Sequence, residues 1–464
     1  MTILKEPVLC KRIPTHPWGD PADRKVISYD EYVRTGGYKG LANALAMQPK
    51  EVVDLVKSAE VRGRGGAGFP AGMKWSFLPP EDGGRRYLAI NSDESEPGTF
   101  KDRLLIDFDP HIIIEGIAIC MHACRLDTAY VYIRGEYHHQ RDVFENAIKE
   151  AYANKVLGPD SRLGQINGRW PGLFLHRGAG AYVCGEETAL LESLEGKRGW
   201  PRIKPPFPAV AGAFGRPTII NNVETLAICT PILERGADGP KWFQSMGTQR
   251  PEGAPPHVPA SFGPKLFGVS GHVNRPGVYE EELGITLKEM IEGLCQGMRG
   301  GKKFKSAIPG GISTGVLGPD EYDVRLDFDI TKYDTLGLGT AGVIVMDEDT
   351  DMVSVARNIA RFFSHESCGQ CTPCREGTNW MAKMLARIEA GDGTSRDLDL
   401  LLEIAGSMGA LPSGRGATIC GLADGANWAI RTIVNKFWDE FEAKVSKSHF
   451  VSLSVVGLTH PNHV

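Results

Sequence analysis

The segment from Val61 to Trp75, VRGRGGAGFPAGMKW, combines closely spaced glycines with the cations Arg62, Arg64 and Lys74. Glycine lets backbone N–H groups approach a ligand closely and adopts positive φ without strain. Arginine and lysine add charge and hydrogen-bond donors that suit phosphate. The segment therefore predicts a loop that holds a phosphorylated ligand. A glycine-rich surface turn is the alternative.

These glycines fit only part of a dinucleotide-binding fingerprint. Gly63, Gly65 and Gly68 match G-x-G-x-x-G, but the fingerprint requires a strand immediately before the glycines. Residues 49–61 instead carry valines at helical spacing. We therefore expect a helix over residues 41–61 before the loop, and not the usual Rossmann arrangement.

Composition sets broad limits on the chain. With 464 residues it is long enough for two to four domains. A hydrophobic content of 42% and a charged content of 23% are typical of a soluble globular protein. A net charge of −5 argues against a general nucleic-acid binder. The sequence has no apolar run of membrane-spanning length and no signal or transit peptide pattern at its start, so we expect a cytosolic protein or one bound to a membrane through a partner.

The first half of the chain alternates between strand and helix patterns, which predicts an α/β layer with a largely parallel sheet. The expected elements are strands at 87–91, 128–134 and 173–176 and helices at 111–125 and 138–157. A polar run follows the first strand and contains Asp93, Glu94 and Glu96. Ligands bind beyond the carboxyl ends of such strands, so these carboxylates are either ligand acceptors or part of a solvated acidic loop.

Three later segments carry polar residues of the same kind. Residues 177–190, RGAGAYVCGEETAL, follow a strand and place Glu186 and Glu187 in the first turn of an expected helix. These carboxylates either cap the helix dipole or accept hydrogen bonds from ribose or amide groups. The stiff PRIKPPFP run holds Lys204 and Phe207. The amides at positions 221 and 222 either bind phosphate and sugar oxygens or cap the next helix.

The second half of the chain predicts two further units. Residues 236–265 are rich in glycine and proline and indicate a linker. Residues 266–345 indicate a small β-grasp-like unit, with strands and one helix over 285–294. After residue 347 the pattern becomes helical, and short loops between four helices predict a small bundle. The expected helices are 352–363, 375–388, 397–408 and 427–445.

A cysteine motif stands within the helical part of the chain. Cys368, Cys371 and Cys374 form C-x₂-C-x₂-C, the spacing of the first three ligands of a ferredoxin-type motif. The fourth ligand must come from far away, and Cys420 is the natural candidate. This spacing favours a [4Fe–4S] cluster over a Cys₃His zinc site that would use His365.

Taken together, GRGGAGFPAGMKW, NSDESEPGTFKDR, GAGAYVCGEETAL, the Asn221–Asn222 segment and ESCGQCTPCREG resemble the NADH-binding flavoprotein subunit of respiratory NADH:quinone oxidoreductase, complex I. The resemblance extends over about residues 35–446. It implies an N-terminal extension (1–40), an FMN- and NADH-binding α/β domain (41–240), a β-grasp (SLBB-like) domain (262–346) and a helical bundle with one [4Fe–4S] cluster (350–446).

The resemblance also implies site residues. FMN is expected to contact Gly63, Arg64, Gly65, Gly66, Lys74, Asn91, Asp93, Glu94, Tyr182, Gly185, Glu186, Asn221 and Asn222. Ala67, Gly68 and Thr225 belong to the same cofactor-binding set. The adenine of NADH is expected among Phe69, Phe77 and Phe207, with its polar groups held by Glu96, Glu187 and Lys204. The cluster ligands are expected to be Cys368, Cys371, Cys374 and Cys420.

The implied activity is oxidation of NADH by hydride transfer to FMN, with electrons then passed singly to the cluster. A flavin accepts a hydride and releases electrons one at a time, so the protein supplies alignment and electrostatics and no side chain acts as an acid, base or nucleophile. The implied partners are a thioredoxin-like [2Fe–2S] subunit and the large iron–sulfur subunit of the peripheral arm. The implied location is peripheral, on the cytoplasmic side of the inner membrane and bound to the membrane only through the complex.

Three alternative functions fit parts of the pattern. The chain could be the diaphorase subunit of an NAD-linked hydrogenase or formate dehydrogenase. It could be a non-catalytic interaction module in which zinc staples the bundle. A flavin reductase that acts alone is the third, although such an enzyme would not need the cysteines.

Overall fold

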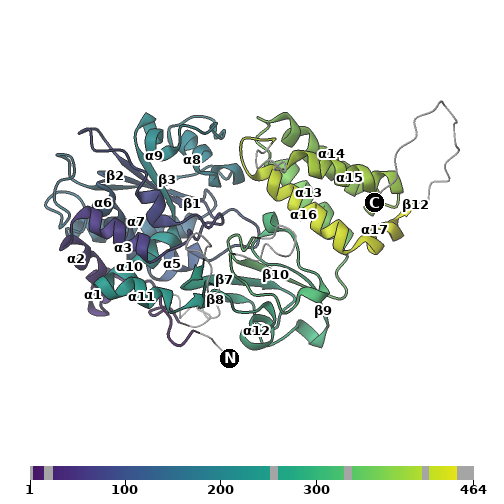
Figure 1. Ribbon diagram of the computed structural model, residues 1–464, viewed down its shortest axis with the longest axis horizontal. Helices are drawn as coiled ribbons and strands as arrows, with labels where there is room; N and C mark the ends of the chain where they lie inside the picture. The colour runs from purple at the N-terminus through teal and green to yellow at the C-terminus, as the bar shows by residue number, and fades with distance from the viewer. Residues whose placement is uncertain (1–3, 15–24, 251–259, 329–336, 410–416, 447–464) are drawn as a thin grey trace.

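A computed structural model describes residues 4–14, 25–250, 260–328, 337–409 and 417–446 of the chain. Figure 1 shows three units: an α/β unit, a second sheet beside it, and a group of long helices at the opposite side. The order along the chain is the predicted one, with the α/β unit first and the helices last.

The α/β unit is built on a four-stranded parallel sheet in the order β3-β2-β1-β4. The strands are β1 (Tyr87–Ser92), β2 (Thr128–Ile133), β3 (Gly172–Arg177) and β4 (Thr218–Asn222). The predicted α/β class with a parallel sheet is therefore confirmed. Asn91 of β1 lies opposite Asn222 of β4, so the carboxyl ends of these two central strands meet at one edge of the sheet.

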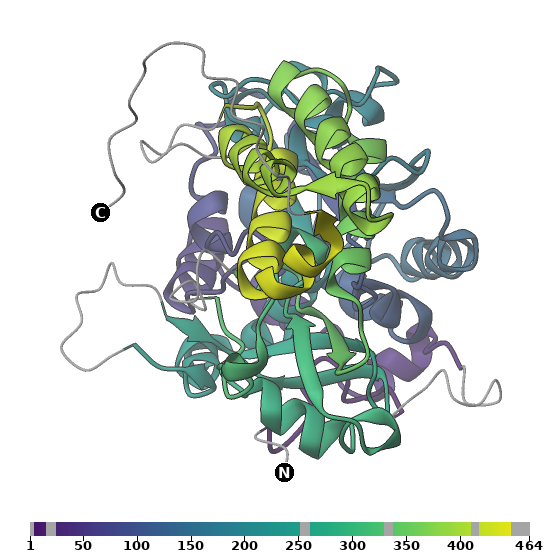
Figure 2. The ribbon, with the colours of Figure 1, turned by 90° about the vertical axis from the view of Figure 1, so that its right-hand side faces the viewer.

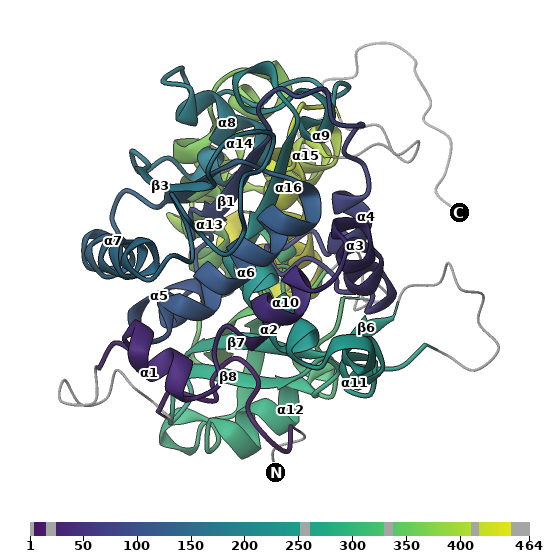
Figure 3. The same ribbon diagram turned by 90° about the vertical axis from the view of Figure 1, so that its left-hand side faces the viewer.

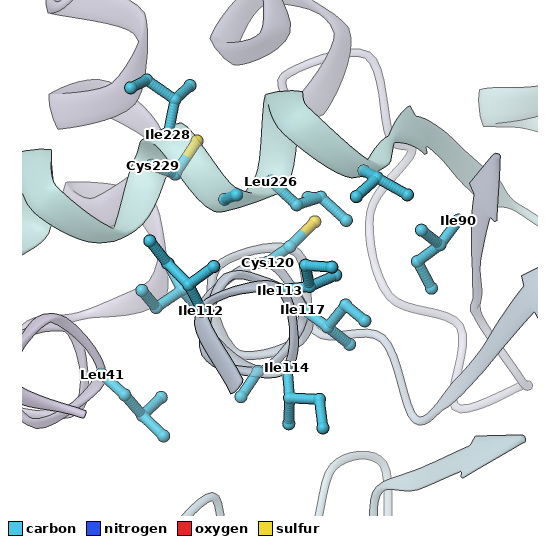
Figure 4. Packing of buried hydrophobic residues seen from close by; sticks show 14 of the residues in the cluster. Leu41, Ile90, Ile112, Ile113, Ile114, Ile117, Cys120, Leu226, Ile228 and Cys229 are labelled. Carbon is cyan, nitrogen blue, oxygen red and sulfur yellow. The ribbon is translucent and has the colours of Figure 1, made fainter. Parts of the chain in front are cut away.

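Helices surround this sheet. They are α1 (Tyr29–Arg34), α2 (Lys39–Leu45), α3 (Pro49–Ser58), α4 (Ala71–Trp75), α5 (Asp102–Phe108), α6 (Pro110–Cys124), α7 (His138–Ala153), α8 (Glu187–Leu194), α9 (Pro208–Ala211), α10 (Val223–Glu234) and α11 (Gly239–Gln244). Helix α6 is apolar around nearly its whole circumference and lies in the core. Figure 3 shows α6 and α10 side by side with α2 and α3 close to them. Figure 4 shows Cys120 of α6 beside Leu226 of α10.

Two predictions for this region need correction. The single helix expected over 41–61 is two helices, because Pro49 starts α3 and cannot continue α2. The linker expected over 236–265 contains α11 and the short paired strands β5 (Gly247–Thr248) and β6 (Ser261–Phe262). Burial of Phe243 in the main core holds this segment in place despite its glycine and proline content. Residues 251–259 of that segment lie outside the described part of the chain.

The second unit is a mixed sheet in the order β8-β7-β10-β9. Its strands are β7 (Pro264–Gly271), β8 (Gly277–Glu282), β9 (Phe304–Ile308) and β10 (Gly342–Asp347). Strand β7 runs antiparallel to β8 and parallel to β10. Strand β10 in turn runs antiparallel to β9. The helix expected over 285–294 is shorter: α12 (Leu287–Glu289) is followed by a wider helical turn over Met290–Leu294.

The helical unit contains α13 (Met352–Glu366), α14 (Thr372–Glu389), α15 (Ser395–Met408), α16 (Leu422–Lys436) and α17 (Trp438–Lys444). A short pair of strands, β11 (Gly393–Thr394) and β12 (Val445–Ser446), closes it. The last helix expected from sequence, 427–445, begins earlier and divides at Phe437. Figure 2 shows these yellow and light-green helices above the green second sheet. Within the described ranges, no helix is long and apolar enough to cross a membrane.

A buried group of charges joins the α/β unit to the second sheet. The carboxylate of Glu224, at the start of α10, lies 2.6 Å from Lys265 Nζ of β7 and 2.9 Å from Lys101 Nζ before α5. It also accepts a hydrogen bond from the backbone N–H of Leu266 at 3.0 Å. All three charged side chains are almost fully buried. Burial opposes ionisation of Glu224, but the charges of Lys101 and Lys265 outweigh it and lower its pKa to about 2.

We predict that Glu224→Gln lowers the free energy of unfolding by about 3–5 kcal/mol, because it leaves two buried ammonium groups without their shared carboxylate. Lys265→Met should cost less, since Glu224 keeps Lys101 as its partner. Thermal denaturation followed by circular dichroism measures both variants. A larger loss of stability in Lys265→Met than in Glu224→Gln would contradict this account.

Candidate functional site

A cleft of about 430 Å³ lies where the three units meet. This volume is within the usual range for ligand pockets. The α/β unit supplies its lining at 65–67, 91, 93–96, 99, 101–102, 182–183, 185–186 and 222. The second unit adds residues 313–314, 337 and 339–340, and the helical unit adds 420–422, 425 and 428.

The glycine loop forms one wall of the cleft through Gly65, Gly66 and Ala67. Gly66 has φ of +123°, which side chains rarely tolerate. A Cβ at Gly65 would lie 3.0 Å from Cβ of Asn222, so the loop is pressed against the end of β4. Gly63 closes the turn by donating its N–H to the carbonyl of Phe69 at 2.9 Å. Glycine is therefore needed here for both backbone conformation and close approach.

Two residues predicted to contact the cofactor support this loop from behind. The side chain of Arg64 is fully buried away from the cleft and donates to the carbonyl of Phe262 at 3.0 Å. Its backbone N–H donates to Thr225 Oγ1 at 2.8 Å. Burial lowers the pKa of Arg64 to about 10. The geometry gives Arg64 and Thr225 a structural role in fixing the loop.

The three acidic residues after β1 have different surroundings. Glu94 accepts hydrogen bonds from the N–H groups of Asp102 and Arg103, at 2.7 and 3.1 Å, and from Tyr137 Oη at 2.9 Å. Burial raises its pKa to about 7. Glu94 thus lines the cleft while its carboxylate holds the start of α5.

Asp93 and Glu96 also line the cleft. Oδ2 of Asp93 is buried and has no hydrogen-bond partner among the described residues, and burial raises the pKa of Asp93 to about 7. Glu96 accepts hydrogen bonds from Tyr182 Oη at 2.6 Å and from the N–H of Ser313 at 2.8 Å. Burial raises its pKa above the usual value. Asp93 therefore offers an unsatisfied acceptor to a ligand that donates a hydrogen bond.

The predicted residues of α8 and the PRIKPPFP run form one ionic group. Lys204 Nζ lies 2.7 Å from Glu187 and 3.1 Å from Glu186, and Lys74 Nζ lies 3.4 Å from Glu187. Glu186 also caps α8 by accepting from the N–H groups of Thr188 and Ala189. These opposing charges lower the pKa of Glu187 despite its burial. Glu186 therefore caps the helix, as one interpretation predicted, and it also lines the cleft.

The asparagines at the strand ends are also anchored. Asn91 donates to the carbonyl of Gly185 at 2.8 Å, and Asn221 accepts from the indole N–H of Trp75 at 2.8 Å. Asn222 caps α10 by accepting from the N–H of Glu224, and it donates to Asp102 at 2.6 Å. Of the three, Asn91 and Asn222 line the cleft.

The three phenylalanines predicted to hold adenine have exposed side chains: Phe69, Phe77 and Phe207. The rings of Phe69 and Phe77 lie 6.0 Å apart between centroids. They offer flat apolar surface for stacking beside the α/β unit.

Sequence reasoning missed the contributions of the other two units to the cleft. Ser313, Thr340 and Trp428 line it, yet they lie far along the chain from the glycine loop and belong to no motif. Lys101 also lines the cleft. The only signal for Lys101 was its position among the acidic residues after β1.

The four predicted cysteines line a second, much smaller cavity of about 10 Å³. Cys371 and Cys374 lie at the start of α14, Cys368 follows α13, and Cys420 precedes α16. Oγ of Ser367 lies 3.3 Å from Sγ of Cys374. Burial raises the pKa of Cys420 to about 12, so a thiolate at this position would require the charge of a bound metal.

The described side chains do not form a site for a single metal ion. Tetrahedral zinc with Zn–S bonds of roughly 2.3 Å requires sulfurs roughly 3.8 Å apart. Among the residues whose placement is described, no three His, Cys, Asp or Glu side chains are grouped closely enough to hold one metal ion. His365 has 84% of its side chain exposed and lies near Glu366. His365 does not line the cysteine cavity, which argues against the Cys₃His zinc alternative.

The cleft and the cysteine cavity share a wall. Cys420 and Leu422 line both of them. A ligand in the cleft and a metal group among the cysteines would therefore be neighbours separated by the start of α16.

Comparison with known proteins gives a family match for the region of the glycine loop and another for the region of the cysteine motif. Residues 56–230 match the Nuo51 FMN-binding domain, and residues 354–444 match the NADH-ubiquinone oxidoreductase-F iron-sulfur binding region. The chain is 47% identical over 444 residues to the F 2 subunit of NADH-quinone oxidoreductase of Rhizobium meliloti (strain 1021), covering 95% of this chain and 98% of that protein. It is 46% identical over 401 residues to the F subunit of NADH-quinone oxidoreductase of Rickettsia rickettsii (strain Sheila Smith), covering 86% and 90%.

A solved structure is also similar. A chain in the crystal structure of NAD⁺-reducing [NiFe]-hydrogenase in the air-oxidized state superposes with a TM-score of 0.77 at 34% identity. The match covers 93% of this chain and 69% of that chain.

We predict that Glu186→Ala lowers the free energy of unfolding by about 1 kcal/mol, because it removes the acceptor that caps α8. Glu187→Ala is the matched control, since its carboxylate binds lysines and caps no helix. Thermal denaturation without added ligand measures both. Wild-type stability in Glu186→Ala would mean that the cap contributes nothing.

Proposed function

The chain belongs to the family of NADH-quinone oxidoreductase F subunits, and on that premise we propose how its residues carry out the work of this protein. It oxidises NADH by hydride transfer to FMN and passes the electrons on through a [4Fe–4S] cluster. It is the electron-input subunit of the enzyme. The residue-level proposal rests on one observation: Cys420 and Leu422 line both the cleft and the cysteine cavity.

FMN is assigned to the large cleft. The loop at Gly65 and Gly66 offers close backbone approach, and Asn91 and Asn222 offer amides at the strand ends. The unsatisfied Oδ2 of Asp93 supports this assignment, because a bound flavin can donate a hydrogen bond to it. When bound, FMN accepts a hydride and releases electrons singly.

NADH is assigned to the side of the cleft near α8. Exposed Phe69, Phe77 and Phe207 suit stacking with adenine. Glu187 and Lys204 are paired with each other and can exchange that contact for polar groups of the nucleotide. Glu96 sits deeper, bonded to Tyr182 and Ser313. These residues would align the nicotinamide, and alignment alone accounts for a large share of rate in such reactions.

The [4Fe–4S] cluster is assigned to the cavity lined by Cys368, Cys371, Cys374 and Cys420. The C-x₂-C-x₂-C spacing of the first three cysteines, with Cys420 lining the same cavity, fits such a cluster. The Ser367 hydroxyl near Cys374 can donate a hydrogen bond that stabilises thiolate charge. Because Cys420 also borders the cleft, electrons need not leave the protein between the two groups.

The domain limits follow as proposals: an extension over 1–40, an FMN/NADH domain over 41–240, a β-grasp (SLBB-like) domain over 262–346 and a cluster-bearing bundle over 350–446. The order β8-β7-β10-β9 with a short helix supports the β-grasp assignment. The extension includes α1 and the start of α2, and its residues 1–3 and 15–24 lie outside the described part.

The protein works within a multi-subunit complex. We propose a thioredoxin-like [2Fe–2S] subunit and the large iron–sulfur subunit of the peripheral arm as its neighbours. In this arrangement the protein is peripheral, on the cytoplasmic side of the inner membrane.

A second candidate is the diaphorase subunit of an NAD-linked hydrogenase, favoured by the similarity to a chain of the NAD⁺-reducing [NiFe]-hydrogenase. Purification with native neighbours separates the two. NADH oxidation coupled to quinone supports the first, and hydrogen-dependent NAD⁺ reduction supports the second.

We predict that Glu96→Gln raises KM for NADH more than it lowers kcat. The amide removes the negative charge that faces the nucleotide but keeps the shape that contacts Tyr182. Steady-state assays of NADH oxidation with ferricyanide separate the two constants. A fall in kcat with unchanged KM would assign Glu96 to the chemical step instead.

We predict that Cys371→Ala abolishes onward electron transfer, because the variant lacks a cluster ligand, while NADH still bleaches the flavin. Stopped-flow absorbance follows the flavin, and the rate of quinone reduction by the reconstituted complex follows onward transfer. Cys10→Ala is the control, since Cys10 contacts the Glu280 region far from the cluster. A native quinone-reduction rate in Cys371→Ala would refute the ligand assignment.

A further inference from the structure

Trp200 makes a direct contact between the α/β unit and the cysteine loop. Its indole Nε1–H donates a hydrogen bond to the backbone carbonyl of Cys368 at 3.1 Å. The two residues are 168 positions apart in sequence. Trp200 is 37% exposed, so its other face remains at the surface. No motif in the sequence marks this tryptophan.

The loop that carries Trp200 is held tightly. The Arg198 guanidinium lies 4.3 Å from the centre of the indole ring, a cation–π contact that fixes the ring orientation. A Cβ at Gly199 would lie 2.6 Å from Sγ of Cys184, so this backbone is packed directly on the α/β unit. The next residue, Pro201, lines the cysteine cavity. Trp200 is therefore a rigid donor and not a freely moving surface side chain.

A second hydrogen bond connects the Cys368 loop to the α/β unit. Glu366, two residues before Cys368, accepts from the backbone N–H of Tyr182 at 3.1 Å. Tyr182 lines the cleft and packs edge-on against Phe362 of α13. Cys368 itself packs against the small apolar cluster around α8. The first cysteine of the motif is thus fixed relative to the cleft at two points.

We propose that Trp200 is a positioning residue for the iron–sulfur cluster, holding the Cys368 loop against the α/β unit through its indole N–H. This inference rests on the proposed role of Cys368 as a ligand. The contact acts in two ways. It fixes the ligand loop at a constant separation from the cleft, and it directs the positive end of an N–H dipole toward a loop that becomes more negative on reduction.

The physical consequence is a change in cluster potential when the donor is removed. Trp200→Phe keeps an aromatic ring at this position, removes the N–H donor and shortens the side chain, a loss of volume that the Trp170→Phe control shares. Without that dipole, reduction of the cluster is less favourable, so its midpoint potential should shift to a more negative value. The loop should also gain freedom, which broadens the electron paramagnetic resonance (EPR) spectrum of the reduced cluster.

The test uses the purified full-length holoprotein with its FMN and cluster. Anaerobic redox titration with EPR gives the midpoint potential and line shape for wild type, Trp200→Phe and Trp170→Phe. Trp170 is the matched control because it is 39% exposed in a different part of the α/β unit. Flavin content and circular dichroism establish that each variant is folded.

A negative shift of the midpoint or a broadened signal in Trp200→Phe, with Trp170→Phe like wild type, supports the role. Loss of the cluster from folded, flavin-containing Trp200→Phe also supports it. An unchanged potential and line shape, or an equal change in Trp170→Phe, overturns it and leaves the ligand assignment intact. Wild-type protein without any four-iron signal overturns both.

Discussion

The structure depends on one buried carboxylate at the junction of two units. Glu224 stands at the start of α10, close after the Asn222 that lines the cleft, and binds Lys101 and Lys265 from either side. Lys101 is part of the cleft wall, whereas Lys265 belongs to β7 of the second sheet. A buried ion pair of this kind tolerates little displacement, because separation of its partners leaves uncompensated charge in the core. The second sheet is thereby fixed to the edge where ligands bind.

That fixed junction explains why a three-unit chain can have a single site. The parallel sheet brings Asn91 and Asn222 to one edge, and the glycine loop closes against it. The second unit contributes Ser313, whose backbone N–H donates a hydrogen bond to Glu96 and so orients its carboxylate. The helical unit then places Cys420 where it borders both cavities. To pass the two electrons of a hydride on one at a time, the flavin and the cluster must lie close together. The fold meets this requirement because a single chain forms both cavities.

Local patterns in the sequence predicted much of this correctly. Alternating apolar strands and helices predicted the parallel sheet. Cysteine spacing indicated Cys368, Cys371 and Cys374, and Cys420, the candidate for a distant fourth ligand, lines the same cavity. The sequence-based predictions failed where tertiary packing decides which segments are ordered and which side chains are buried. Burial of Phe243 turns an apparent linker into α11, and Arg64 is a charged residue whose side chain faces the interior. Periodicity carries no information about such placements, nor about cleft residues such as Thr340 that lie outside every motif.

The most direct measurement of the central claim is anaerobic addition of NADH to the wild-type holoprotein, with flavin absorbance and cluster EPR recorded on the same sample. The account predicts one FMN and about four iron atoms per chain. It also predicts flavin bleaching followed by the signal of a reduced [4Fe–4S] cluster. Protein that contains zinc in place of iron, or a cluster that stays oxidised while the flavin is fully reduced by excess NADH, would contradict it.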